Sequence, residues 1–422
     1  MSKAPPLSQR ARAYGPQPIS ELMRMALARP ELISLAAGFV DQATLPVAET
    51  ADALCAVLRD VDRSRAALQY GNNAGNLPLR EAVLSRLLTA DGTLSRKRPH
   101  SDQVLLTAGS NQLLHLLGEV LLDRGDIVLC AAPTYFVYLG MLSSLEARGV
   151  GVAIDDDGMI PAALEEQLAR LEKSGERQRV KAIYVNSYFE NPSSVTLSLA
   201  RRAEIVEIAK RHSTHAPLYV IDDAAYRDLR YEGDDLPSLQ SFDDDGSTVI
   251  VAETFSKSFS PGVRVGWGLL PPELVAPVLA LKSSIDFGSP HLNQHLMASV
   301  LERGLLEPHI ALLRTTYRAK MTAMLSALQQ NLGDIPGIRW SRPRGGLYVW
   351  LELPDGMPAG PGGKLIGHAL EEGVLYVPGE YGYAAEGEPR RQDRIRLSFG
   401  VQSIGNIQRG IEALGRAVRR SL

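Results

Sequence analysis

The middle of the chain alternates short apolar runs with amphipathic stretches. Between Val104 and about Leu270, β-branched runs are separated by segments such as LARRAEIVEIAKRH, in which apolar residues recur at helical spacing. Strands that alternate with helices indicate a mainly parallel sheet between layers of helices. We therefore predict an α/β fold whose large domain contains a mainly parallel seven-stranded sheet. The runs that predict its strands are VLLT, DIVLCA, VGVAI, VKAIYVN, PLYVID, TVIVAE and VGWGLL.

The pattern changes towards the C-terminus. Residues 291–330 have helical spacing throughout, and we expect two helices broken near Pro308, because proline disrupts a helix interior. The last third contains the strand patterns IRW, GGLYVWLEL and RIRLSFG among helical ones, which predicts a smaller α+β domain. We assign residues 1–19 to a polar N-terminal arm, 20–60 and 310–422 to the small domain, and 61–309 to the large domain.

Charge and cysteine content narrow the expected partners and compartment. The net charge of -3 offers no basic field, so nucleic acid is not an expected partner. Cys55 and Cys130 are the only cysteines, which favours a reducing, cytoplasmic environment over a disulfide framework. The sequence has neither a signal-peptide core nor eighteen uninterrupted apolar residues, so we expect no membrane association. His291 and His295 stand four residues apart without a third ligand, and helix surface or core explains them better than a metal.

Lys257 lies on a loop that leaves a predicted buried strand. The apolar run STVIVAE precedes it and VRVGWGLL follows it. In open α/β sheets, ligands bind beyond the carboxyl ends of the strands. A lone lysine is more often a solvated surface charge, but this position places Lys257 at the ligand-binding edge. Three more loops at predicted strand ends carry polar residues: TAGSNQ at 107–112, ENPSS at 190–194 and DDAAY at 222–226.

One of these loops is suited to a phosphate. The turn at 109–111 would present backbone N–H groups at a helix N-terminus, which attracts a phosphate dianion. An ordinary helix cap explains this turn better than a phosphate site does when the turn is taken alone. Arg264, together with Thr254 and Ser256, would complete a phosphate cup, because the guanidinium fork matches phosphate oxygens.

A pair of aspartates indicates which phosphate compound is expected. Asp222 and Asp223 end the apolar run PLYVI, and a buried carboxylate needs a cationic partner or strong hydrogen bonds. A protonated pyridine nitrogen is such a partner. A strand-end lysine, a phosphate cup, a buried aspartate and an aromatic side chain for stacking are together what pyridoxal 5′-phosphate requires. The chain has no P-loop spacing and no G-x-G-x-x-G after its first strands, so nucleotide and nicotinamide cofactors are not expected.

The motifs around these residues resemble a known family. SKSFSPGVRVGW resembles the lysine motif of fold-type I pyridoxal-phosphate enzymes, and the class I/II aminotransferases acting on 2-aminoadipate, kynurenine and aromatic amino acids are the most similar group. The resemblance covers nearly the whole chain, through LQYGNNAGNLPLRE, TAGSNQ, PTYFVY, NP, DDAAY, RGGLYVWLELP, GVLYVPG and RIRLSFG. It implies a fold-type I enzyme that moves an amino group between an L-amino acid and a 2-oxo acid.

The resemblance also implies the cofactor contacts. Lys257 would form the internal aldimine and act as general base, and Asp223 would pair with the pyridinium nitrogen. Asn191 and Tyr226 would hydrogen-bond the phenolic oxygen of the ring, and Tyr135 would stack on its face. The phosphate and its surroundings would be held by Gly109, Ser110, Asn111, Thr254, Ser256, Arg264 and, from a neighbouring subunit, Tyr70.

The substrate contacts follow from the same resemblance. Arg396 in RIRLSF would bind the substrate α-carboxylate, and Gly38 would contribute a backbone contact near it. Asn191 and Tyr70 would also face the substrate. Because Tyr70 would act across subunits, the resemblance implies a homodimer with shared active sites.

The chain departs from the family pattern near the substrate. The residues preceding and following Asn191 lack the family's usual proline, glutamine and glycine, and Glu190 would add a negative charge close to the cofactor. Ser194 takes the place of the glycine, and Phe39 replaces a residue of the substrate entrance. Arg24 stands one position from where 2-aminoadipate enzymes place an arginine for the substrate side chain.

Other functions remain alternatives at this point. The same fold hosts pyridoxal-phosphate lyases, racemases, cyclases and oxidases, and the motifs alone do not separate them from aminotransferases. Some relatives are ligand-sensing domains of transcription regulators, joined to a winged-helix segment. Residues 1–19 are too short for such a segment, which favours an enzyme.

Overall fold

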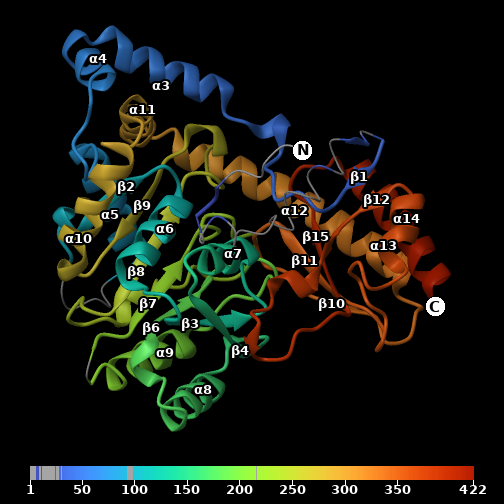
Figure 1. Ribbon diagram of the computed structural model, residues 1–422. Helices are drawn as coiled ribbons and strands as arrows, with labels where there is room; N and C mark the ends of the chain where they lie inside the picture. The colour runs from blue at the N-terminus through green and yellow to red at the C-terminus, as the bar shows by residue number, and fades with distance from the viewer. Residues whose placement is uncertain are drawn as a thin grey trace.

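The computed structural model describes residues 6–8, 11, 24, 28–29, 31–92, 98–214 and 216–422. The predicted arm at 1–19, and the helical pattern that follows it, fall almost wholly outside these residues. Figure 1 shows a large sheet wrapped by helices, with a smaller sheet and helices α13 (Leu365–Glu371) and α14 (Ile404–Ser421) beside it. No helix in the described part of the chain is long and apolar enough to cross a lipid bilayer.

The large sheet contains all seven predicted strands. Their order across the sheet is β4-β3-β6-β7-β8-β9-β2, and all neighbours pair in parallel except β9, which is antiparallel to both of its neighbours. The two-residue strands β14 (Glu386–Gly387) and β5 (Gly158–Met159) pair with β4 and bring the sheet to nine strands. The seven longer strands are β2 (Val104–Thr107), β3 (Ile127–Ala132), β4 (Arg148–Asp155), β6 (Val180–Val185), β7 (Tyr219–Asp223), β8 (Val249–Thr254) and β9 (Gly266–Leu269).

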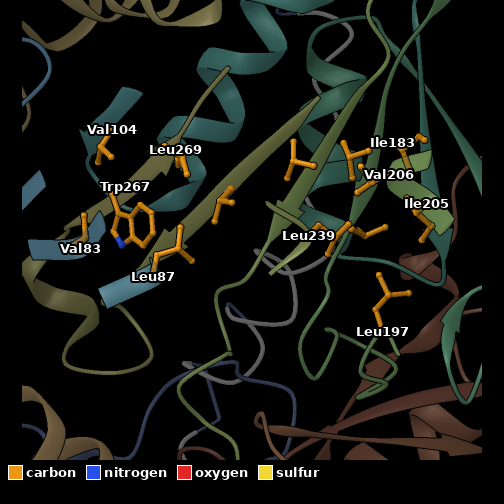
Figure 2. Packing of buried hydrophobic residues seen from close by; sticks show 14 of the residues in the cluster. Val83, Leu87, Val104, Ile183, Leu197, Ile205, Val206, Leu239, Trp267 and Leu269 are labelled. Atoms are coloured by element: carbon orange, nitrogen blue, oxygen red, sulfur yellow. The ribbon is translucent and has the colours of Figure 1, made fainter. Parts of the chain in front are cut away.

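Side chains of these strands alternate between two apolar layers, because successive residues of a strand point to opposite faces. In β8, Val249 and Val251 enter one layer, whereas Ile250 and Ala252 enter the other. The first layer lies under helices α5, α8, α9 and α11, and Figure 2 shows part of it around Trp267. The second layer lies under α6, α7 and α10. The bounds of these helices are α5 Leu77–Asp91, α6 Ser110–Leu121, α7 Phe136–Ser144, α8 Pro161–Lys173, α9 Leu199–Arg211, α10 Pro272–Asp286 and α11 His291–Glu302.

A second core forms around the smaller sheet. That sheet is antiparallel, with the strand order β10-β11-β15-β13, and packs with helices α12, α13 and α14. A short parallel pair, β1 with β12, ties the segment after residue 32 to this part of the molecule. Their bounds are α12 Leu306–Leu332, β1 Ile33–Ser34, β10 Arg339–Trp340, β11 Tyr348–Glu352, β12 Val374–Leu375, β13 Val377–Pro378 and β15 Arg394–Ser398.

The predicted break in the helical stretch 291–330 is present, but it precedes Pro308. Helix α11 ends at Glu302, Gly304 has a positive φ of 66°, and α12 begins at Leu306. Proline is tolerated in the first turn of a helix, where its missing N–H has no intrahelical acceptor. Pro308 therefore lies inside the first turn of α12, and Gly304 provides the break. Helices α3 (Val47–Arg59) and α4 (Val61–Leu68) lie along α11 at the upper edge of Figure 1.

Candidate active site

A cavity of about 320 Å³ lies where the carboxyl ends of the parallel strands meet the smaller sheet. It brings together residues from loops that are far apart in the sequence. Of the predicted site residues, the cavity is lined by Gly38, Gly109, Ser110, Asn111, Tyr135, Asn191, Asp223, Tyr226, Thr254, Ser256, Lys257, Arg264 and Arg396.

One end of the cavity is formed by the first turn of α6 and the loop after β8. Helix α6 begins after Gly109 without a side-chain cap, so its first backbone N–H groups face the cavity end. Gly109 has a φ of 83°, and a Cβ there would lie 2.5 Å from an Arg264 nitrogen. Gly266 of β9 is equally constrained, because a Cβ there would lie 2.6 Å from the Ser110 nitrogen. Glycine at both positions therefore permits the close packing of this end.

Side chains of the same loop complete this end of the cavity. The Arg264 guanidinium donates to the Ser256 hydroxyl at 3.3 Å and to the Ala108 carbonyl at 2.9 Å. The Thr254 hydroxyl donates to Ser256 Oγ at 2.9 Å. A guanidinium, two hydroxyls and a helix N-terminus thus converge where a phosphate would be bound.

Lys257 lines the same cavity. Its Nζ donates to the Gly38 carbonyl at 3.0 Å. Burial lowers the pKa of the Lys257 ammonium, and the nearby guanidiniums of Arg396 and Arg264 lower it further. A lysine with a lowered pKa supplies the neutral amine that nucleophilic and base chemistry require.

The two neighbouring aspartates point in different directions. Asp222 does not line the cavity; its carboxylate accepts hydrogen bonds from the Ser187 hydroxyl and, at 3.2 Å, from the Leu239 N–H. Asp223 lines the cavity and is 4% exposed. Consecutive residues of a strand face opposite sides, so only one of the pair is able to serve the site.

Asp223 is held by a tyrosine that the sequence interpretation missed. The Tyr184 hydroxyl donates to Asp223 Oδ2 at 2.7 Å, and the Asn186 amide donates to that hydroxyl at 3.0 Å. Tyr138 stacks on the Tyr184 ring with a centroid distance of 3.9 Å. Burial raises the pKa of Asp223 to about 6, while the Tyr184 hydrogen bond acts to lower it.

Arg396 lines the side of the cavity where the substrate is expected to bind. This arginine is 2% exposed and donates to Asn191 Oδ1 at 2.8 Å and to the Ala36 carbonyl at 2.6 Å. Its guanidinium lies 4.4 Å from the ring centroid of Tyr348. No carboxylate of the described chain lies within 4 Å of the Arg396 guanidinium. It therefore retains the capacity to bind an acidic ligand.

Tyr70 is the one predicted site residue that does not line the cavity. It follows α4, is 77% exposed, and makes an edge contact with Phe287 at a centroid distance of 5.5 Å. Phe287 and Leu68 nearby are also exposed. Within one subunit, Tyr70 is thus separate from the other predicted residues.

Three residues that depart from the family pattern now have positions. Phe39 lines the cavity and is 52% exposed, as expected for an entrance residue. Glu190 is buried outside the cavity and accepts a hydrogen bond from the Ser193 hydroxyl at 2.6 Å. Burial raises the pKa of Glu190 to about 8, so the predicted extra negative charge is largely neutralised at pH 7.

Ser194 has a φ of 63°, and its hydroxyl contacts the Ser341 hydroxyl at 2.7 Å, away from the cavity. Arg24 is exposed and does not line it.

Several further cavity residues escaped the sequence interpretation. Tyr348 and Asn186 line the cavity together with Phe136 and Val137. Tyr348 and Tyr184 lie in buried apolar strands, where an aromatic residue ordinarily indicates core packing. Their hydroxyl partners are 122 and 39 residues away in the sequence, so no local pattern signals them.

A larger cavity of about 950 Å³ lies between α5, α11 and α12 and contains none of the predicted residues. Its carboxylates pair with arginines, as in Arg86 with Asp228 at 2.6 Å and Arg63 with Glu302 at 2.9 Å. Among the described residues, no group of three or more His, Cys, Asp or Glu side chains is placed to hold a metal. The smaller cavity therefore remains the candidate active site.

The residues of this cavity fit pyridoxal 5′-phosphate. The buried Oδ1 of Asp223 has no hydrogen-bond partner in the described part of the chain, and a pyridinium N–H would provide one. At one end the α6 N-terminus and Arg264 suit a phosphate, and Lys257 lies near enough to Arg264 and Arg396 for both charges to lower its pKa. The donor set thus matches the three parts of the cofactor: ring nitrogen, phosphate and aldehyde carbon.

Comparisons with known proteins decide the family. Residues 30–414 match the family model for aminotransferase class I and II. The chain belongs to the class I and II aminotransferases. An aromatic-amino-acid aminotransferase of Thermococcus litoralis is 32% identical over 98% of this chain and 94% of its own length.

Solved aminotransferases share the fold. The kynurenine aminotransferase of Pyrococcus horikoshii, in complex with pyridoxamine phosphate (PMP), is 32% identical with a TM-score of 0.90 and covers 99% of this chain and 97% of its own. The α-aminoadipate aminotransferase of Thermus thermophilus, bound to N-(5′-phosphopyridoxyl)-L-leucine, is 32% identical with a TM-score of 0.84 and covers 98% of this chain and 97% of its own.

This aminotransferase has pyridoxal-phosphate fold type I, as predicted from its motifs. It uses pyridoxal 5′-phosphate to transfer an amino group between an amino acid and a 2-oxo acid. The alternative lyase, racemase, cyclase and oxidase reactions are not favoured, because the family and these relatives are aminotransferases.

Proposed function

We propose that Lys257 is the residue that bonds the cofactor covalently and moves the proton in this aminotransferase. The observation that carries the proposal is that Lys257 Nζ, the unpartnered Oδ1 of Asp223 and the Arg396 guanidinium line one cavity. When bound, pyridoxal 5′-phosphate supplies an electron sink for the bond electrons of the substrate α-carbon. Lys257 Nζ would act as the base that removes the proton at that carbon. The lowered pKa of Lys257 favours the neutral amine that this step needs.

The remaining cofactor contacts are assigned by position. Asp223 Oδ1 would accept the ring N–H, while the Tyr184 hydroxyl keeps Oδ2 occupied so that the carboxylate stays oriented. The hydroxyl of Tyr226 and the amide of Asn191, which line the same cavity, would donate to the ring oxygen, and Tyr135 would pack on the ring. Ser110, Asn111, Thr254, Ser256 and Arg264 would hold the phosphate, with Gly109 allowing the turn.

The substrate is oriented by its α-carboxylate. Arg396 binds the two carboxylate oxygens, while Asn191 and the Ala36 carbonyl hold the guanidinium in place. The backbone of Gly38 lies beside Lys257 Nζ and limits the space at the α-carbon.

We assign an apolar or aromatic side chain to the preferred substrate. Among the described residues that line the cavity, the cations are Lys257, Arg264 and Arg396, and each already has a role. Phe39 and Val137 supply an apolar wall on the substrate side. The relatives named for aromatic amino acids and kynurenine are compatible with this assignment, whereas 2-aminoadipate would require a second cation.

A homodimer with shared sites completes the proposal. Tyr70 is exposed beside Phe287 and Leu68 and does not line the cavity of its own subunit, so it is available to reach a neighbouring one. Each site would then consist of one subunit's Lys257 and the other's Tyr70. The cytoplasmic location stays a prediction that rests on the two cysteines, both of which are free thiols.

A single-turnover experiment tests the reaction and the substrate class. Protein loaded with one equivalent of pyridoxal 5′-phosphate is given one amino acid and no oxo acid. We expect one equivalent of 2-oxo acid per subunit, with the cofactor left in its amine form, and faster conversion of aromatic and aliphatic amino acids than of 2-aminoadipate. Lys257→Ala is the control and produces no oxo acid. Product accumulating beyond one equivalent would contradict transamination.

Subunit mixing tests the shared site. In a hybrid dimer of Tyr70→Phe with Lys257→Ala, one site combines an intact Lys257 with an intact Tyr70 if sites are shared. We expect that site to retain wild-type cofactor affinity, whereas Tyr70→Phe homodimers bind more weakly. Equal weakness in hybrid and homodimer, measured by fluorescence titration, would show that Tyr70 does not act across subunits.

A further inference from the structure

Tyr348 stands at the contact between the small sheet and the active site without an assigned role. It begins β11, is 2% exposed, and lines the cavity. Its hydroxyl lies 3.0 Å from the hydroxyl of Tyr226, which follows β7 of the large sheet. The two rings meet edge to face with a centroid distance of 5.8 Å. A hydrogen bond between two buried tyrosines thus joins the two sheets beside Lys257.

Counting protons gives this hydrogen bond a direction. Burial raises the pKa of Tyr226 well above its usual value, so the hydroxyl keeps its proton. Each hydroxyl has one proton to donate, and only one of the two protons lies in their shared hydrogen bond. In the described chain, neither hydroxyl has a second hydrogen-bond partner. One O–H therefore remains available for a bound molecule.

We propose that Tyr348 is a positioning residue that donates its proton to Tyr226 and thereby aims the Tyr226 hydroxyl at the ring oxygen of the cofactor. The proposal rests on the function assigned above, in which Tyr226 donates to that oxygen. If Tyr226 donates to the cofactor, its own oxygen is free to accept, and Tyr348 is the neighbour placed to donate. A chain of hydrogen bonds polarises each member, so the bond from Tyr226 to the cofactor is strengthened.

The surroundings of Tyr348 hold its ring in place and leave room for its hydroxyl oxygen. A Cβ on Gly38 would lie 2.6 Å from the Tyr348 oxygen, so the absence of a side chain at Gly38 makes room for that oxygen. The Arg396 guanidinium packs on the Tyr348 ring at 4.4 Å from its centroid. The residue proposed to bind the substrate carboxylate therefore also holds the ring that carries the donating hydroxyl.

Tyr348→Phe tests the proposal, because it removes one oxygen and keeps the ring that packs on Arg396. A donor to the ring oxygen stabilises negative charge on that oxygen. This favours loss of the proton from the Lys257 nitrogen that would be bonded to the cofactor. Weakening that donor keeps this proton bound to higher pH. We expect the midpoint of the absorbance titration of bound cofactor to rise by about 0.3–1 pH unit, the scale of one weakened hydrogen bond.

A double-mutant cycle separates this route from an independent effect of Tyr348. Tyr226→Phe alone should shift the midpoint further than Tyr348→Phe does. Adding Tyr348→Phe to Tyr226→Phe should then cause no further shift, because Tyr348 acts through the Tyr226 hydroxyl. Additive shifts would overturn the proposal and would place the Tyr348 hydroxyl directly on the cofactor or the substrate.

Tyr376→Phe is the matched control, since the Tyr376 hydroxyl is also buried but donates to the Ala359 carbonyl at 2.7 Å, and it does not line the cavity. It should leave the midpoint unchanged. If Tyr226→Phe shifts the midpoint but Tyr348→Phe does not, the relay is wrong while the proposed function stands. If Tyr226→Phe also causes no shift, the assigned contact between Tyr226 and the ring oxygen fails.

Discussion

The two ends of the active-site cavity are built in different ways. The phosphate end comes from two turns of the large sheet, at 109–111 and 254–264, which contact each other directly. The substrate end joins the segment after β1, a loop after β6 and strands β11 and β15 of the small sheet. The first end is therefore fixed by a single folded unit, whereas the second depends on how two sheets and an N-terminal segment meet.

This difference predicts where substitutions should be tolerated. At the phosphate end, Gly109 and Gly266 leave no space for a side chain. At the substrate end, Phe39 is half exposed and Glu190 lies behind Asn191, outside the cavity. We expect substitutions at the first end to abolish cofactor binding and substitutions at the second to change substrate binding.

The largest effect is expected between the two ends, at Asp223. Asp223→Asn keeps the shape and an acceptor for the Tyr184 hydroxyl but removes the charge that holds the ring nitrogen protonated. We expect turnover to fall by on the order of 10³-fold, the scale of losing one preorganised electrostatic contact. Steady-state kinetics at saturating cofactor would measure it. Unchanged turnover would mean that Asp223 is not the partner of the ring nitrogen.

Arg264→Ala and Arg396→Ala compare the two ends with the same substitution. Arg264→Ala should weaken cofactor binding, whereas Arg396→Ala should weaken amino-acid and oxo-acid binding and leave cofactor content intact. For the buried Arg396 a desolvated charged contact contributes roughly 2–5 kcal/mol, whereas the exposed Arg264 should contribute less. Cofactor content by absorbance and KM for the amino acid separate the two outcomes. Loss of cofactor from Arg396→Ala would show that the ends are not independent.

The smallest effect on activity is expected for Glu190→Gln, because Glu190 lies outside the cavity; this variant tests stability instead. In the folded protein, burial raises the pKa of Glu190 from 4.5 to about 8, so folding takes up a proton between these values. The contribution of Glu190 to the free energy of unfolding is therefore greatest below about pH 4.5 and falls as the pH rises towards 8. Glutamine stays neutral and can accept the hydrogen bond from Ser193.

We accordingly expect Glu190→Gln to match the wild type near pH 4 and to exceed its stability at pH 9 by roughly 3–5 kcal/mol, the free-energy equivalent of this pKa shift. Urea unfolding at both pH values is the measurement. Parallel changes in the two proteins would show that Glu190 is ionised in the folded state.

The sequence predicted those parts of the molecule that neighbouring residues along the chain specify. Seven β-branched runs gave the seven longer strands, because burial on both faces of a parallel sheet requires them. Lys257, Arg264 and Asp223 stand at the ends of such runs, where a polar residue contrasts with its surroundings. Cofactor residues of this kind were therefore predictable, although their roles stay proposals.

Features that depend on distant contacts were not predictable. Strands β1, β5, β12 and β14 have two residues each, too few for a periodic pattern. Tyr184 and Tyr348 have aromatic side chains that suit a buried strand, and only their hydroxyl partners give them a further role. The division into domains at 60 and 309 stays a prediction; helix α12 runs across the second boundary without interruption.

Helix α12 also has a mechanical consequence. Its 27 residues form a rod about 40 Å long that starts just after Gly304 beside the large sheet and ends in the core of the small one. A rod of that length amplifies rotation: turning about 5° at its start moves its far end by about 3.5 Å. A change of a few degrees near Gly304 is therefore enough to move the far end of α12, inside the core of the small sheet, by about the width of a water molecule.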